Sequence, residues 1–202
     1  MAELFTYVVL YDIGFAPNPY FGTCTLATCK PEIRKSASPG DWVAGIGSMQ
    51  KGQQDHLVYA MRVEETLSFD EYWTDPRFAS KKPNRVGSLK LRYGDNIYHR
   101  SADESTWIQE DSRHSLGDGS PNLAHVKRDT SAPRVLASTS FAYYGADAIQ
   151  IPEEFRDWEG KDYFGSVRGY RRNFPDGLRT AFISWLESQS DVGIAGEPLD
   201  WQ

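Results

Sequence analysis

The chain has 202 residues, of which 40% are hydrophobic and 25% charged, a composition typical of a globular protein that can bury a sizeable core. Its formal net charge of −6 argues against a protein that coats nucleic acid through bulk positive charge. This net charge is still compatible with a local basic patch or with a pocket for a small molecule. No apolar run reaches the length of about 18 residues that a spanning helix needs, and the N-terminus lacks a signal-peptide pattern. We therefore expect a cytoplasmic protein with no membrane partner.

Strand signals dominate the first third of the chain, where β-branched and aromatic residues cluster between turn-forming residues. We expect strands at residues 5–12, 21–26, 42–47 and 55–63, the last two as a hairpin. Pro31 suits the first turn of a short helix that ends near Lys35. A Pro-Gly-Asp turn at residues 39–41 opens the third strand. That strand, WVAGIG, contains two glycines, which often mark the close approach of a ligand or of another backbone. We interpret it as a pocket wall.

The remaining elements are fewer and more widely spaced. Ser68 and Glu71 have capping-box spacing and predict a helix from residue 69 to about 73. Residues 77–134 show little periodicity, with strand-like pieces at 89–93 and 97–99, and we interpret them as a functional insertion. Residues 133–144 predict another strand. A last helix at residues 176–188 carries a core stripe of Leu178, Phe182, Trp185 and Leu186.

These elements predict a fold class. At least five strands with a few short helices and a C-terminal helix indicate a single α+β domain over residues 1–202, with a mainly antiparallel, barrel-like sheet. We expect residues 5–63 and 133–145 to form the closed or nearly closed sheet.

Polar and aromatic residues gather in the insertion. The segment GDNIYH brings Asp95, Asn96, Tyr98 and His99 together, and Trp107 and His114 follow. Asp95, His99 and His114 are candidate acid–base groups. The alternative is a turn with no function, because Gly-Asp-Asn is good turn chemistry. The four histidines are far apart in sequence and show no metal-binding spacing, so we expect no metal site.

Basic residues form a second candidate site. Arg168, Arg171, Arg172 and Asn173 lie just before the last helix and could hold a phosphate. The alternative is a solvated loop whose arginines pair with carboxylates at residues 157–162. Lys30 and Arg34 are a second phosphate candidate, with a solvated helix face as the alternative.

The two cysteines and the missing motifs narrow the chemistry. Cys24 and Cys29 are five residues apart, which matches neither zinc nor redox spacing, and we interpret them as small buried or half-buried residues. No GxSxG, P-loop or GxGxxG motif occurs, so hydrolase, kinase and dinucleotide-binding classes lose support. Catalysis by a pair of carboxylates remains an alternative, with Asp12, Asp95, Asp111 and Asp129 as the candidates.

Several segments together resemble the nucleotide modification associated domain 2 family. They are TLATCKPEIRKSASPGDWVAGIGS, GDNIYH with WIQEDSRHS, RVLASTSFAYYG and VRGYRRNFPDGLRTAFISWL, in the expected order over nearly the whole chain. The resemblance implies a role with modified bases or nucleotides, in phage or bacterial systems that hypermodify DNA. The strand, helix, Gly-Asp turn and strand of residues 21–63 also look like the PUA, ASCH and EVE group of β-barrels, which hold a nucleobase in an aromatic cleft.

Two functions follow as hypotheses. The first is a module that binds a nucleotide, a modified base or nucleic acid, without a cofactor and as a subunit of a DNA-modification system. The expected contacts are Phe21, Thr25, Lys30, Arg34, Trp42, Gly47, Ser48, Asn96, Tyr98, Trp107, Arg168, Arg171, Arg172 and Asn173. The alternative is an enzyme that acts on such a base, with Asp95, His99 and His114 as its acid–base groups. A weaker third hypothesis is a structural accessory subunit.

Overall fold

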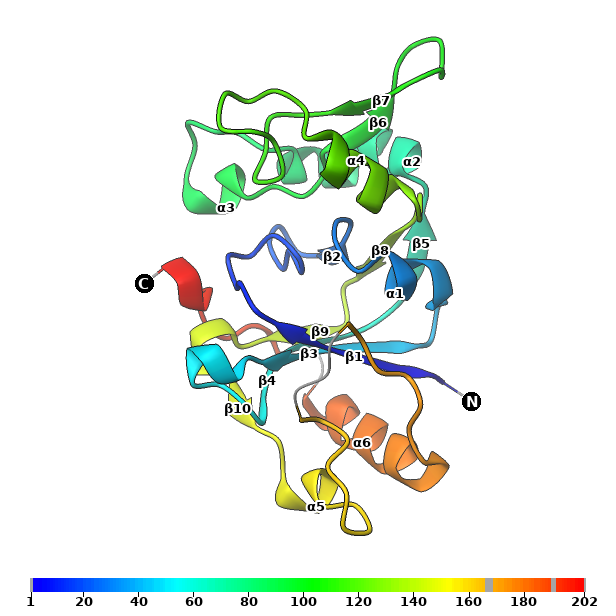
Figure 1. Ribbon diagram of the computed structural model, residues 1–202, viewed down its shortest axis with the longest axis vertical. Helices are drawn as coiled ribbons and strands as arrows, with labels where there is room; N and C mark the ends of the chain where they lie inside the picture. The colour runs from blue at the N-terminus through cyan, green and yellow to red at the C-terminus, as the bar shows by residue number, and fades with distance from the viewer. Residues whose placement is uncertain (1, 166–168, 190–191, 202) are drawn as a thin grey trace. The chain divides into compact units, whose positions relative to one another are not determined.

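The computed structural model describes residues 2–165, 169–189 and 192–201, and the chain divides into two compact units (Figure 1). Unit 1 comprises Met1–Ile13, Ala37–Glu64 and Ser138–Gln202, and unit 2 comprises Gly14–Ser36 and Glu65–Ala137. The expected insertion at 77–134 lies within unit 2. That the two units form one domain stays a prediction.

Unit 1 is built on a six-stranded mixed sheet. Its strands are β1 (Leu4–Val9), β3 (Trp42–Gly47), β4 (His56–Arg62), β9 (Phe141–Tyr143), β10 (Ile149–Gln150) and β11 (Gly193–Ile194). The order is β1-β3-β4-β9-β11, and β10 pairs with β4. The expected hairpin of β3 and β4 is confirmed, with antiparallel pairing and an irregularity at Gly45 and Ile46. β1 runs parallel to β3, and β11 runs parallel to β9.

Two helices, α5 (Glu153–Arg156) and α6 (Asp176–Gln189), lie on the same side of this sheet (Figure 1). The stripe of Leu178, Phe182 and Leu186 on α6 is fully buried and shares one core with Trp42 and Ala44 of β3. The helix and these three residues of its stripe were therefore predicted correctly, and the fourth, Trp185, is partly buried against the same core. Short 3₁₀ turns, η1 (Met49–Lys51), η3 (Gly145–Asp147) and η4 (Leu199–Trp201), complete the unit. In the ranges that the structure describes, no helix is long and apolar enough to cross a bilayer.

The two glycines of β3 make room for the protein's own atoms. A Cβ on Gly45 would lie 2.5 Å from the Tyr59 ring, and one on Gly47 would lie 2.1 Å from the carbonyl oxygen of Gln53. Real Cβ atoms do not approach other atoms so closely, so a side chain at either position would force its neighbour to move. Glycine in this strand is explained by close packing inside unit 1.

Unit 2 contains shorter elements. They are β2 (Cys24–Leu26), α1 (Pro31–Ser36), β5 (Glu65–Leu67), α2 (Phe69–Thr74), η2 (Pro76–Lys81), α3 (Leu89–Arg92), β6 (Tyr98–Arg100), β7 (Trp107–Gln109), α4 (Leu123–Thr130) and β8 (Val135–Ser138). A three-stranded sheet has the order β2-β8-β5, and β6 and β7 form an antiparallel hairpin. The capping box before α2 is confirmed by both of its hydrogen bonds, between Ser68 and Glu71. The strand expected at residues 89–93 is wrong, because a helical turn forms there.

The expected closed barrel is also wrong. Mixed α/β structure with several short helices is confirmed, but within the described ranges no sheet closes on itself. The reason is that β2 does not join the sheet of β1 and β3 and pairs instead in the sheet of β8 and β5. The strand expected at 133–144 is also divided, with β8 and β9 in different sheets. The proposed likeness to PUA, ASCH and EVE barrels is therefore not confirmed by the fold.

Candidate active site

Cys29 lies in the tight turn that joins β2 to α1. Its φ angle is 57° and that of Lys30 is 39°, both in the left-handed region that residues other than glycine rarely adopt. Pro31 then starts α1, at the helix position where a missing N–H costs nothing. The backbone N–H of Cys29 donates to Oδ1 of Asp129 at 3.1 Å. The turn thus holds a half-buried thiol in a conformation that costs about 1–3 kcal/mol per residue, of the kind found at functional sites.

A thiol, an imidazole and a carboxylate stand in a line in unit 2. The Sγ atom of Cys29 lies 3.6 Å from Nε2 of His114, and Nδ1 of the same ring lies 2.8 Å from Oδ2 of Asp129. The three residues come from separate elements: the turn before α1, the loop after β7, and the last turn of α4. This is the order of contacts found in Cys-His-Asp nucleophilic sites.

The hydrogen bonds fix the protonation of the imidazole. Asp129 also accepts from Tyr98 Oη at 3.0 Å and from Arg128 Nε at 2.9 Å. Burial alone raises the pKa of Asp129, but hydrogen bonds from His114 and Arg128 outweigh it and hold that pKa well below its usual range. An ionised carboxylate only accepts, so Nδ1 of His114 carries a proton. Burial lowers the pKa of His114, which favours the neutral ring and leaves Nε2 as an acceptor.

The thiol is therefore positioned as a donor to this acceptor. Burial, and then the charge of Asp129, raise the pKa of Cys29, while the charges of Arg128 and Lys30 act in the opposite sense. The raised pKa of Cys29 and the lowered pKa of His114 both favour a neutral thiol beside a neutral imidazole. A general base so placed removes the proton as the sulfur attacks an electrophile.

A buried arginine holds this arrangement together. Arg34 is fully buried, and burial lowers its pKa to about 10. Its Nε donates to the Cys29 carbonyl at 2.9 Å, and its Nη2 donates to the Asp129 carbonyl at 2.6 Å. Nη1 donates to the carbonyls of Ala132 and Arg134. Arg34, which the sequence assigned to a phosphate, thus ties the Cys29 turn to the end of α4.

Two aromatic rings fix the orientation of the imidazole. Phe15 lies edge-on to His114, with ring centroids 4.7 Å apart. The ring of His125 lies 4.3 Å from it, and the Nδ1 atom of His125 is 3.0 Å from the His114 carbonyl oxygen. His114 is thereby restrained through its ring and its backbone.

A second buried network surrounds Asp95. Its Oδ2 accepts from Thr25 Oγ1 at 2.7 Å, and its Oδ1 accepts from Tyr72 Oη at 2.8 Å. Lys81 Nζ donates to the side chain of Asn18 at 2.8 Å and to its carbonyl at 3.0 Å. All five residues are fully or almost fully buried. Burial raises the pKa of Asp95 and lowers that of Lys81 to about 8, so both groups are shifted toward their neutral forms.

His99 occupies a third place in unit 2. Its Nε2 lies 2.9 Å from Glu110 Oε1, and its ring stacks on Trp73 with centroids 4.1 Å apart. Trp107, which the sequence assigned to base stacking, is partly exposed on β7, and the Arg100 guanidinium lies 4.0 Å from its ring centroid. These cation–π and stacking contacts engage the rings with side chains of the same unit.

The remaining predicted contacts are scattered over both units. In unit 2, Phe21 is 42% exposed, and the buried Asn96 donates to the Tyr72 carbonyl at 2.8 Å. In unit 1, Trp42 is buried in the core, and Ser48 accepts from the Gln50 N–H at the start of η1. Arg171, Arg172 and Asn173 precede α6, and Arg168 lies outside the described residues. Ligand binding by these residues stays a prediction.

Sequence reasoning found His114 but missed its two partners as a set. Asp129 was one of several carboxylates, and Cys29 was interpreted as structural because its spacing from Cys24 matched no motif. A signal was present: a cysteine immediately before a Lys-Pro helix start, with histidines and carboxylates farther along the chain. Spatial proximity between residues 29, 114 and 129 is not visible in the sequence.

The fold and this site define a mixed α/β protein with a Cys-His-Asp array in one of its two units, in which the imidazole and the carboxylate are buried and the thiol is half-buried. The model of the nucleotide modification associated domain 2 family matches residues 1–202, the whole chain. The chain belongs to this family, as its segments had suggested, and the family name links it to nucleotide modification. Comparison with curated proteins and with solved structures finds no significant match to either.

Proposed function

We propose that the protein is a thiol-dependent enzyme of nucleotide modification, with Cys29 as its nucleophile. The observation that carries this proposal is the Cys29–His114–Asp129 array, in which each atom faces the partner that nucleophilic catalysis requires. The family supports the substrate class, a nucleotide or modified base. Acyl groups attached to such a base by ester or amide bonds are the electrophiles best suited to this array.

The reaction begins when Cys29 Sγ attacks the acyl carbon of the substrate. The thiol proton passes to Nε2 of His114, an S–C bond forms, and the carbonyl electron pair moves onto oxygen. When this pair returns, the bond to the base nitrogen or oxygen breaks, and the leaving atom takes the proton from His114. Water, deprotonated by His114, then attacks the thioester, which releases the acid and restores the thiol. Asp129 stays ionised throughout and acts as a positioning residue that stabilises the imidazolium.

A binding module that recognises a nucleotide, base or nucleic acid without chemistry is the second candidate. The observation that favours it is a basic and aromatic hollow in unit 1, lined by Lys161, Tyr163, Arg172 and other residues. Either function is compatible with a subunit of a DNA-modification system.

p-Nitrophenyl acetate tests the nucleophile without knowledge of the natural substrate. We expect one equivalent of p-nitrophenolate in a rapid phase, with the acetyl group on Cys29 by peptide mass spectrometry. His114→Gln should slow this phase by about 10²-fold or more, the usual contribution of a general base. Cys24→Ala is the matched control and should retain the phase. A phase that persists in Cys29→Ala would exclude Cys29 as the nucleophile.

A panel of deoxynucleosides with ester or amide substituents on the base then separates the two functions. An enzyme releases the substituent, and Cys29→Ala abolishes the release. A binding protein leaves the substituent intact and shows a raised melting temperature, because a ligand that binds only the folded state stabilises it.

A further inference from the structure

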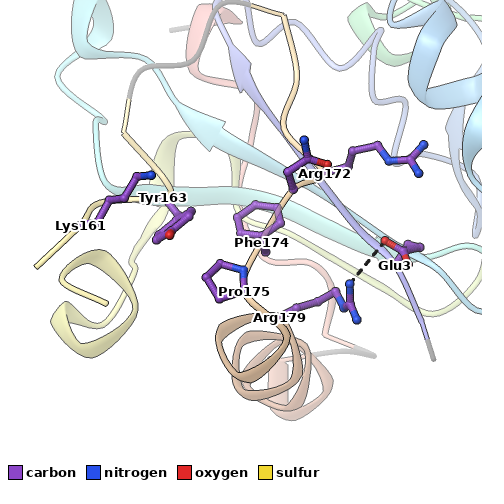
Figure 2. Close-up of a pocket in the computed structure, with 8 residues that line it drawn as sticks. Glu3, Lys161, Tyr163, Arg172, Phe174, Pro175 and Arg179 are labelled. Atoms are coloured by element: carbon purple, nitrogen blue, oxygen red, sulfur yellow. Dashed lines mark ion pairs between the residues drawn. The ribbon is translucent and has the colours of Figure 1, made fainter. Parts of the chain in front are cut away.

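Unit 1 contains an open hollow of about 470 Å³ beside the start of α6. Three cationic side chains and one carboxylate line it, together with two aromatic rings, a proline and an asparagine (Figure 2). These residues are Glu3, Lys161, Tyr163, Arg172, Asn173, Phe174, Pro175 and Arg179. In a chain with a net charge of −6, such a surplus of positive charge in one hollow favours an anionic ligand.

Only one of the three cations that line the hollow is neutralised by a described carboxylate. Arg179 pairs with Glu3 at 3.7 Å (Figure 2). It also pairs with Asp176 at 2.9 Å. Lys161 and Arg172 are exposed and form no ion pair with any described residue. Elsewhere in unit 1, Arg156 is paired with a carboxylate. Lys161 and Arg172 thus differ from Arg156 in keeping their charge unpaired among the described residues.

Aromatic rings make cation–π contacts with the cations at this hollow. Lys161 Nζ lies 4.9 Å from the Tyr163 ring centroid, and the Arg171 guanidinium lies 5.5 Å from the same ring. The Arg172 guanidinium lies 6.0 Å from the ring of Phe5. A cation–π contact positions a cation without cancelling its charge, because the ring has no net charge. The side chains are thus oriented while their charge stays available to an anion.

The backbone that carries the cations is fixed. Arg171 exchanges two backbone hydrogen bonds with Thr6 of β1, at 2.9 and 2.8 Å. Phe174 is buried and stacks on Phe164, with centroids 5.5 Å apart. Arg172 and Asn173 lie between these two anchors, so binding here costs little ordering of the main chain.

We infer that this hollow binds the phosphate group of a nucleotide, with Arg172 as its principal contact. The Arg172 side chain is directed away from Lys161 (Figure 2), so Lys161 contacts another part of the same ligand. Arginine binds phosphate with paired N–H donors, and lysine contributes a point charge. The Asn173 amide adds a polar donor, and Tyr163 and Phe174 offer aromatic surface next to the phosphate. The phosphate has two sources, a mononucleotide or a strand of nucleic acid. This site is independent of the thiol chemistry in unit 2.

Fluorescence titration tests the site with two probes, dAMP and a fluorescein-labelled single-stranded DNA oligonucleotide. We expect binding that weakens as salt rises, and Arg172→Glu should weaken it by about tenfold or more and reduce the salt slope by about one. Lys161→Glu should act in the same direction. Arg62→Glu is the matched control, because Arg62 is an exposed residue of unit 1 outside the hollow and its reversal changes the net charge equally.

The outcomes separate the sources and can overturn the site. Competition by dAMP at the same affinity as the strand identifies a mononucleotide site, and a strand that binds tenfold more tightly identifies nucleic acid. Absence of binding by both probes overturns the proposal, as does an equal loss in Arg62→Glu. Arg172→Gln repeats the test without charge reversal if Arg172→Glu lowers the melting temperature. Cys29 acetylation, measured on the same variants, shows separately whether the proposed enzyme function stands.

Discussion

Unit 2 contains two buried polar networks, each close to a cysteine and each with a carboxylate. They differ in the groups at which their chains of hydrogen bonds end. In the network of Asp95 and Lys81, the described hydrogen bonds end on other buried protein groups. In the network of Asp129 and His114, the chain of contacts ends on a half-buried thiol. The first network completes the interior of the unit, whereas the second ends on the thiol that we propose as the nucleophile.

The two networks also differ in the charge of their carboxylates. Burial raises the pKa of Asp95 and raises that of the nearby Cys24 thiol to about 12. Asp129 keeps its charge because His114 and Arg128 donate to it. Burial of a titratable group is thus a poor indicator of function. The better indicator is a nucleophilic atom beside an unprotonated base.

The largest expected effect is a difference between the alkylation rates of the two cysteines. Iodoacetamide should alkylate Cys29 in the native protein at least about a thousandfold faster than Cys24, because fully buried Cys24 reacts only when the structure opens. Peptide mass spectrometry over a time course measures both rates. The same labelling in denaturant is the control and should make the rates similar. Equal rates in the native protein would remove the distinction between the networks.

The free energy of unfolding should depend more on the Asp95 network than on Cys29. Asp95→Ala removes the nearest acceptor of both Thr25 and Tyr72, which keep only longer contacts of 3.4 and 3.3 Å, and it removes the carboxylate near Lys81. This should lower the free energy of unfolding by about 3–5 kcal/mol. Cys29→Ala should change it by about 1 kcal/mol or less, because a half-buried thiol contributes little packing. Urea unfolding measures both. A Cys29→Ala variant that loses as much as Asp95→Ala would show that Cys29 is a structural residue.

The smallest effect concerns pH. The folded state holds the pKa of His114 below its ordinary value of 6.5. Below pH 6.5 the unfolded chain therefore binds more protons at this residue than the folded chain, and stability falls as pH falls. We expect wild type to lose up to about 1 kcal/mol per pH unit more than His114→Gln in this range. Parallel urea titrations between pH 7 and 5 check this, and identical slopes would contradict it.

Local signals in the sequence predicted local structure well. The capping box of Ser68 and Glu71, the proline that starts α1, and the apolar stripe of α6 each depend on residues close together in the chain. The hairpin of β3 and β4 was also found, since a short connection joins its strands. These elements were predicted because their physical causes lie within a few residues.

Distant pairings were not predicted. Nothing in Cys24–Leu26 tells that it pairs with β8 more than 100 positions away, and the barrel prediction failed on this point. The Cys29–His114–Asp129 array was not predicted for the same reason. His114 was identified by its type, but its contacts with Cys29 and Asp129 depend on how the elements of unit 2 pack. The glycines of β3 suggested a ligand, and the structure shows the Tyr59 ring and the Gln53 backbone in that space.

The interleaving of the two units has a consequence for protein synthesis. The chain passes from one unit to the other between residues 13 and 14, 36 and 37, 64 and 65, and 137 and 138. Cys29 and Asp129 are 100 positions apart, so the Cys29 thiol leaves the ribosome long before Asp129. During that interval the thiol is an ordinary cysteine, open to oxidation and without a base. Because the array forms only after these long-range contacts, we expect thiol reactivity to report completion of folding rather than early collapse.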